Sequence, residues 1–132
     1  EGPAERSRQE LLAKCCFAVW MVVQQNETNQ NAFREAGGFP ELARALRPGS
    51  DEALLEMAAG AVCALCEGCC QNKSQFREAG GLEPLIGLLA HSCDSVKLNA
   101  AKALCHLAEN EQNRKIVRDL GGLEKFVKLL SH

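Results

Sequence analysis

The apolar positions along this chain follow a helical spacing that returns about every 42 residues. Three sets of five positions share it: Leu12, Cys16, Val19, Trp20 and Val23; Leu54, Ala58, Ala61, Val62 and Leu65; and Val96, Ala100, Ala103, Leu104 and Leu107. Within each set the steps are 4, 3, 1 and 3, which is the stripe of an amphipathic helix. The pattern therefore predicts three long helices, each with a seam of mostly small and aliphatic side chains.

Between the long helices, a Gly-Gly pair occurs three times, at 37–38, 80–81 and 121–122. A glycine just after a helix can adopt the left-handed conformation that ends it, and its neighbour lets the backbone turn sharply. We therefore expect short helices before each pair and second helices after it, at 29–36, 72–79 and 111–120, and at 40–47, 82–91 and 123–131. The pairs lie 43 and 41 residues apart, a period that indicates one structural unit stacked on itself.

The composition supports an all-α fold. Aromatic residues make up only 5% of the chain and tyrosine is absent, whereas strands favour aromatic and β-branched residues. Ala and Leu dominate the periodic segments, and both are strong helix formers. A length of 132 residues corresponds to about three repeats, which is the minimum for a stable stack.

The order of these elements resembles the armadillo repeat. A short helix, Gly-Gly, a second helix and a polar turn precede a long helix with the pattern V-x3-A-x2-AL-x2-LA over residues 96–108. HEAT repeats have a similar length, but they usually have two helices and lack the Gly-Gly break. The resemblance implies a right-handed α-solenoid with three helices per repeat, whose third helices line a concave groove that binds peptides or protein domains.

The repeats divide the chain as follows. We expect a flexible tail at 1–7 and an armadillo segment at 8–132, composed of a partial repeat at 8–28, repeats at 29–70 and 71–110, and a partial repeat at 111–132. The first and last repeats are thus incomplete, as in a segment of a longer array. Apolar residues of the last helix, such as Leu123, Phe126 and Leu130, would then have no covering helix, so we expect a homo-oligomer through the uncapped ends.

In peptide-binding members of the family, the third helix carries an Asn ladder and, in some, a Trp ladder. The matching positions here are Val22, Ala64 and His106, and Ala18, Gly60 and Lys102, so both ladders are absent. This argues against a receptor for nuclear localisation signals. The residues expected in the groove are Cys15, Ala18, Val22, Met57, Gly60, Ala64, Asn99, Lys102 and His106.

Because many of these side chains are small or apolar, we expect an amphipathic helix or an apolar segment of a protein partner in the groove. The alternative is a purely structural array segment of a larger scaffold, without a ligand of its own.

Cysteine is unusually frequent, with 8 residues in the chain. The spacing of Cys63, Cys66, Cys69 and Cys70 overlaps that of an iron–sulfur site, but the first two fall within a helical pattern and no Cys-Pro follows. We therefore expect no metal and no cofactor. Eight cysteines without an evident disulfide framework favour a reducing compartment, the cytoplasm or the nucleus. We expect Cys69 and Cys70 at a helix end, more exposed than the rest and the most readily oxidised.

The remaining signals are negative. A net charge of −2 lacks the basic excess of a nucleic-acid binder, and no apolar run approaches the ~20 residues of a membrane-spanning helix. The three histidines belong to no recognised catalytic motif, so we expect no enzyme activity and no catalytic residue. Arg34, Arg77 and Arg118 recur beside an acidic residue, which is typical of a solvated helix face.

Overall fold

The computed structural model describes residues 2–131, which form nine α-helices and one short 3₁₀ helix. In chain order the helices are α1 (Pro3–Val23), α2 (Glu27–Glu35), α3 (Gly38–Ala45), α4 (Glu52–Cys66), α5 (Cys70–Glu78), α6 (Leu82–Gly87), the 3₁₀ helix η1 (Leu88–Ala90), α7 (Asp94–Leu107), α8 (Glu111–Asp119) and α9 (Gly122–Leu130). Within the described residues there is no strand.

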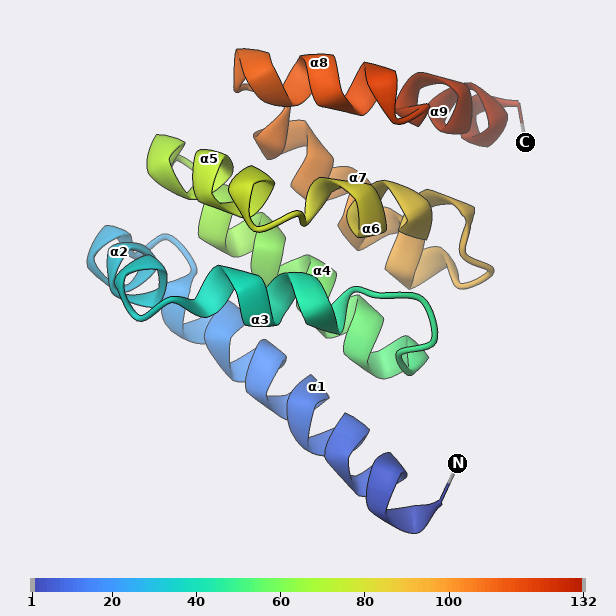
Figure 1. The fold of residues 1–132 in the computed structure, drawn as a ribbon. Helices are drawn as coiled ribbons and strands as arrows, with labels where there is room; N and C mark the ends of the chain where they lie inside the picture. The colour runs from blue at the N-terminus through green and yellow to red at the C-terminus, as the bar shows by residue number, and fades with distance from the viewer. Residues whose placement is uncertain (1, 132) are drawn as a thin grey trace.

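The helices form a stack of three-helix units, as Figure 1 shows. The long helices α1, α4 and α7 lie side by side and form one layer. The shorter helices pack against one face of this layer, and its opposite face is left open by them. The two ends of the chain lie at opposite ends of the stack (Figure 1). The predicted all-α solenoid of about three repeats is confirmed.

Small side chains allow the long helices to pack closely. The seam alanines Ala58, Ala61, Ala100 and Ala103 are completely buried, and the core continues through the aliphatic residues beside them. Close packing of this kind buries most of α4, which has a long helix on each side. No helix within residues 2–131 has the length and apolar character needed to cross a lipid bilayer.

Helix α1 starts earlier than the sequence pattern predicted. Residues 3–7, expected to be a flexible tail, form its first turns, so that prediction is wrong for them. Pro3 opens the helix, and a proline at this position loses no hydrogen bond. Gln9 then donates to Glu5 at 2.9 Å and accepts from the backbone N–H of Asp51 at 2.8 Å, which ties the early turns of α1 to the start of α4.

Each Gly-Gly pair has two distinct roles. Gly80 follows α5 with φ of +79°, the left-handed conformation that the sequence predicted for this position. Gly81 is needed for a different reason, because a Cβ there would lie closer than 3.0 Å to the ring of Phe76. The second glycine therefore makes room for the apolar anchor of the short helix, and Gly38 and Gly122 do the same for Phe33 and Val117.

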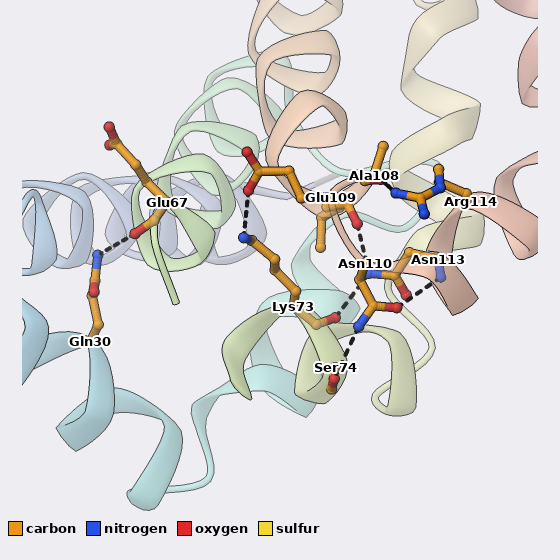
Figure 2. Close-up of polar contacts among 10 residues, drawn as sticks. Gln30, Glu67, Lys73, Ser74, Ala108, Glu109, Asn110, Asn113 and Arg114 are labelled. Carbon is orange, nitrogen blue, oxygen red and sulfur yellow. Dashed lines mark hydrogen bonds and ion pairs between the residues drawn. The ribbon is translucent and has the colours of Figure 1, made fainter. Parts of the chain in front are cut away.

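A ladder of buried amides joins the units on the side of the short helices. Asn72 in α5 donates to the carbonyl oxygens of Leu65 at 2.7 Å and Gln30 at 3.3 Å. Asn113 in α8 repeats this arrangement with Leu107 at 3.0 Å and Lys73 at 3.2 Å, and part of it is visible in Figure 2. Both asparagines are completely buried, so these bonds satisfy carbonyl groups that water does not reach.

Arginines complete this ladder, contrary to their expected place on a solvated face. Arg34 donates to Asn72 Oδ1 at 2.9 Å, and Arg77 donates to Asn113 Oδ1 at 2.9 Å. The side chain of Arg77 is only 14% exposed. The sequence-based interpretation was therefore wrong for these two arginines, because the same residue in successive units points toward the next unit.

Candidate partner-binding surface

A pocket with a volume of about 400 Å³ lies between α1 and α4 on the long-helix layer. Phe17, which is 43% exposed, and Met57 from the facing helix give its walls an apolar character. Its full lining is Gln9, Glu10, Ala13, Lys14, Phe17, Asp51, Ala53 and Met57. An exposed aromatic ring beside a cavity of this size is a place where an apolar side chain of a partner can be buried.

Trp20 extends this surface along the helices. Its ring meets Phe17 edge-to-face, with the ring centroids 5.8 Å apart, and lies over Gly60 of α4. A Cβ on Gly60 would lie closer than 3.0 Å to this ring. Gly60 is therefore buried beneath the ring of Trp20. A partner would contact Trp20 at the point where the sequence pattern predicted Gly60.

The third part of the layer comes from α7 and is more polar. Asn99 donates to the carbonyl oxygen of Glu56 in α4 at 2.9 Å, which links the two long helices. Lys102 and Cys105 lie exposed near Cys63 of α4, and His106 is half-buried. Leu98, four residues before Lys102 and so on the same helix face, is 55% exposed.

The structure separates the nine expected groove residues into distinct groups. Met57, Lys102 and His106 remain accessible on the long-helix layer, whereas Gly60, Ala64 and Asn99 are buried. Trp20 covers Gly60, and Gln30 donates to the carbonyl oxygen of Ala64 at 2.9 Å. These three residues support the surface from below and offer a partner no side-chain contact.

The other three expected residues, Cys15, Ala18 and Val22, are exposed, but they lie beside other cavities. Ala18 and Val22 line a cavity of about 340 Å³ between α1 and α2, and Cys15 lines one of about 190 Å³ between α1 and α3. The structure therefore does not bring these residues together with Met57.

Sequence reasoning missed the residues that give the surface its apolar character. Phe17 stands where the other two repeats have Ala59 and Ala101, and Met21 stands where they have Cys63 and Cys105. Met21 is 48% exposed. The sequence signal that could have identified them is this departure from the repeat. A large apolar residue at a position where the other repeats have a small one is not required by the shared fold, so it indicates a role of its own in that repeat.

The contact between Trp20 and Gly60 leads to a prediction about stability. In an open helix interior, Gly→Ala would stabilise by about 1 kcal/mol, but here overpacking against the ring costs about 1–3 kcal/mol. In the parent, we expect Gly60→Ala to lower the free energy of unfolding. In a protein that already carries Trp20→Ala, we expect the same change to raise the free energy of unfolding. Chemical denaturation followed by circular dichroism, carried out on the parent and the three variants, measures this coupling. Stabilisation by Gly60→Ala in both backgrounds would show that the ring does not rest on Gly60.

The eight cysteines are all free thiols in different environments. Burial raises the pKa of Cys16 to about 11 and raises the pKa of Cys66 strongly, so both stay protonated and unreactive at neutral pH. Cys70 is exposed, as expected, but Cys69 is only 8% exposed, so that expectation was wrong. Cys69 occupies the position before α5 at which Asn26 and Asn110 cap the other short helices, and its sulfur accepts a hydrogen bond from Arg34 at 3.6 Å.

No group of three His, Cys, Asp or Glu residues within 2–131 is arranged to hold a metal ion.

Comparisons with known proteins agree with this architecture. The family model of the armadillo/beta-catenin-like repeat matches residues 69–109. Comparison with curated protein sequences gives no match.

Among solved structures, an engineered protein is 28% identical with a TM-score of 0.87, over 92% of this chain and 49% of its own. A designed armadillo repeat protein in complex with the peptide (KR)4 is 25% identical with a TM-score of 0.86, over 93% of this chain and 52% of its own. The armadillo repeats only protein from Plasmodium falciparum is 21% identical with a TM-score of 0.80, over 89% of this chain and 50% of its own, and shows the fold alone. This chain spans about half the length of these structures.

The matched segment 69–109 covers one full unit of the stack, from the start of α5 to the end of α7. The other units have the same order of helices and the same Gly-Gly turn, and the solved armadillo structures superpose on about nine tenths of the chain. The chain belongs to the armadillo-repeat family.

Proposed function

We propose that this chain is a non-enzymatic protein-interaction module that binds an apolar segment of another protein across its long-helix layer. The observation that carries this proposal is the pocket of about 400 Å³ between α1 and α4, with Phe17 exposed at its wall. Met57 forms the opposite wall, and the partly exposed Trp20 continues the apolar surface beside it. An amphipathic helix of the partner, or an extended apolar segment, would place one side chain in this pocket.

The comparisons support a peptide-binding role, and the exposed side chains of this chain suggest an apolar ligand. One similar structure is a designed protein in complex with the basic peptide (KR)4, and another was designed for modular peptide recognition. In this chain the pocket between α1 and α4 is lined by Glu10 and Asp51 as well as Lys14, so its mixed charge does not select a basic peptide. The exposed apolar side chains favour apolar contact instead.

The experiment selects peptides from a displayed library of amphipathic sequences and measures their affinity. Trp20 is the only tryptophan, so its fluorescence reports binding at this surface directly. We expect Phe17→Glu to weaken binding by about tenfold to a hundredfold, because a charge in the pocket removes the central apolar contact.

The matched control is Val22→Glu, which places the same charge on α1 in the cavity next to α2, away from the pocket. We expect it to bind selected peptides as the parent does. Equal loss in both variants, with helicity unchanged, would place recognition elsewhere. A failure to select any peptide would favour the alternative, a structural array segment without its own ligand.

The free thiols fit a reducing compartment. All eight cysteines are unpaired, and Cys66 lies completely buried in the core, where it packs as a small apolar residue. We propose that the module acts in the cytoplasm or the nucleus, where such thiols stay reduced.

A second candidate function is association between copies of this chain, and the exposed residues of α9 favour it. Leu123, Val127 and Leu130 are 56%, 61% and 84% exposed on this last helix. Burying an apolar side chain of this size is worth about 1.5–3 kcal/mol, so covering these residues would stabilise an assembly.

A further inference from the structure

A Cys-x-x-Cys pair spans the turn between α4 and α5. Cys66 is the last residue of α4, and Cys69 immediately precedes α5. The backbone N–H of Cys69 donates to the carbonyl oxygen of Cys66 at 3.2 Å. Between them, Glu67 has φ −64° and ψ 114° and Gly68 has φ +72°, which are the angles of a type II turn. The outer Cα atoms of such a turn lie within about 7 Å of each other, a separation that a disulfide can span.

The preceding unit holds this turn in place. Gln30 in α2 donates to the carbonyl oxygens of Ala64 at 2.9 Å and Glu67 at 3.2 Å, and Figure 2 shows the second of these bonds. Gln30 is itself buried, so water does not compete for these two acceptors. The backbone around the two cysteines is therefore already fixed in a shape that brings them together.

The equivalent turn between α1 and α2 has no cysteine. Its two inner residues have nearly the same backbone angles, φ −61° and ψ 119° followed by φ +52°. Its outer residues are Val23, which is buried in the core, and Asn26, whose side chain caps α2 by accepting from the N–H of Asn29 at 2.9 Å. Cys69 makes no such cap bond, and a helix without its cap is less stable. The cysteine pair thus replaces a core residue and a cap at the two ends of one turn, which the fold does not require.

The two thiols differ in their access to solvent. Cys69 is 8% exposed, and the residues on both sides of it, Gly68 and Cys70, are exposed. The guanidinium of Arg34 donates to the sulfur of Cys69 at 3.6 Å, and a cation beside a helix N-terminus is the setting of reactive cysteines. Cys66 is completely buried, and burial and then the nearby Cys69 raise the pKa of its thiol. A small oxidant can therefore reach Cys69, whereas Cys66 can react only with a group that the protein itself presents.

We propose that Cys66 and Cys69 are a site of reversible oxidation by hydrogen peroxide, at which a disulfide forms across the turn between α4 and α5. In the first step the sulfur of Cys69 bonds to one peroxide oxygen, the O–O bond breaks, and the thiol proton leaves with the other oxygen as water. In the second step the sulfur of Cys66 bonds to the sulfur of Cys69, the S–O bond breaks, and the released hydroxide takes the Cys66 proton as a second water. Two electrons from the two thiols thus reduce one peroxide to two waters.

The neighbouring cysteines are poorer partners for Cys66. Cys63 lies three residues earlier on α4, where Cβ atoms are about 5–6 Å apart, and a disulfide requires about 3.5–4.5 Å. Cys70 is exposed at the start of α5, whereas Cys66 lies in the core. The turn therefore selects Cys69 as the partner.

Oxidation would act on the contact between two units. The thiol of Cys69 donates to Asn31 of the preceding unit at 3.9 Å, and a disulfide has no S–H with which to keep this bond. Arg34, which contacts the same sulfur, also donates to Asn72 in the buried ladder. In a reducing compartment the pair rests as two thiols and the disulfide is transient. The pocket with Met57 is lined by the first half of α4, so peptide binding and oxidation can be measured separately.

The test identifies the disulfide by fragmentation and mass spectrometry. The fully reduced chain is treated with one equivalent of hydrogen peroxide, the remaining thiols are alkylated, and the protein is cleaved after glutamate residues. Cleavage after Glu67 places Cys66 in fragment 57–67 and Cys69 in fragment 68–78, so only a disulfide keeps the fragments joined. We expect joined fragments that dithiothreitol releases, and a loss of two of the eight free thiols.

Two variants restore the residues of the equivalent turn, so the fold should tolerate them. Cys66→Val and Cys69→Asn are each expected to abolish the joined fragments. In the reduced protein, Cys69→Asn should also raise the midpoint of chemical denaturation, because it restores a cap for α5. The matched controls are Cys63→Ala and Cys70→Ser, which change a cysteine in each of the same fragments and should give joined fragments in the yield of the parent.

The opposite results would overturn the proposal. Joined fragments that persist in Cys66→Val or Cys69→Asn would place the bond between other cysteines, and so would their loss in either control. Sulfinic acid at Cys69 without joined fragments would show that Cys66 does not reach it. Oxidation of Cys70 with Cys69 left unmodified would show that peroxide does not reach the sulfur beneath the turn.

Discussion

Replacing Phe76 by alanine is expected to lower the free energy of unfolding by about 3–5 kcal/mol, the range measured for the loss of a fully buried aromatic side chain. Phe76 is completely buried and meets the ring of Phe39 in the preceding unit, with centroids 6.2 Å apart. Its ring also occupies the space that Gly81 leaves free. The substitution therefore opens a cavity at the point where two units and a turn meet.

Chemical denaturation of the parent and the variant measures this loss, with circular dichroism as the readout. Val117→Ala is the matched control, because Val117 is the equivalent anchor in the last unit, is smaller and is 7% exposed. We expect the control to lose much less stability. A Phe76→Ala variant as stable as Val117→Ala would mean that the central anchor does not join the units.

The fold was predictable because its signals are local and repeated. The glycine that ends each short helix and the five-position stripe of each long helix depend on a few neighbouring residues, and each occurs three times. The start of α1 was not predictable in this way. Residues 3–7 carry no apolar period, and their helix is stabilised through Gln9, which bonds to α4 from a position 42 residues away in sequence.

The candidate surface was predictable only in part, because exposure depends on neighbouring helices. Periodicity placed Gly60 and Ala64 on the correct helix, but it could not show that the Trp20 ring would cover Gly60 or that Gln30 would bond to the carbonyl oxygen of Ala64. Conversely, Phe17 and Met21 interrupt the repeat pattern, and only the packing of α1 on α4 shows that they remain exposed. A repeat pattern therefore identifies shared positions, whereas a binding surface is made by residues that differ between repeats.

The contacts of the buried asparagines and arginines could also not be predicted from the repeat pattern alone. The recurrence of Arg34, Arg77 and Arg118 was visible in the sequence, but their acceptors lie in the following unit, 36 to 38 residues later. The acceptors also have to be oriented by a second bond to a helix end. Such three-way contacts have no signature in a single helix, so the arginines resembled an ordinary solvated face.

The second large effect is expected for Asn72→Leu, which keeps the branching at Cγ, is larger than asparagine and removes every hydrogen bond of the amide. The carbonyls of Leu65 and Gln30 would lose their donor, and Arg34 would lose an acceptor. Because the site is completely buried, water cannot replace these bonds, and each unsatisfied group costs about 1–3 kcal/mol. We expect a loss of about 3 kcal/mol in the free energy of unfolding.

The chain provides its own control in Asn29→Leu. Asn29 occupies the same position in the first unit and makes the equivalent bond to Val22, but this bond lies at the exposed end of the stack. Water can satisfy the freed carbonyl there, so we expect a loss of less than about 1 kcal/mol. Denaturation of both variants under identical conditions separates the two cases. Equal losses would mean that the asparagines act within their own unit, whereas a much larger loss for Asn72→Leu would place the coupling between units in the buried ladder.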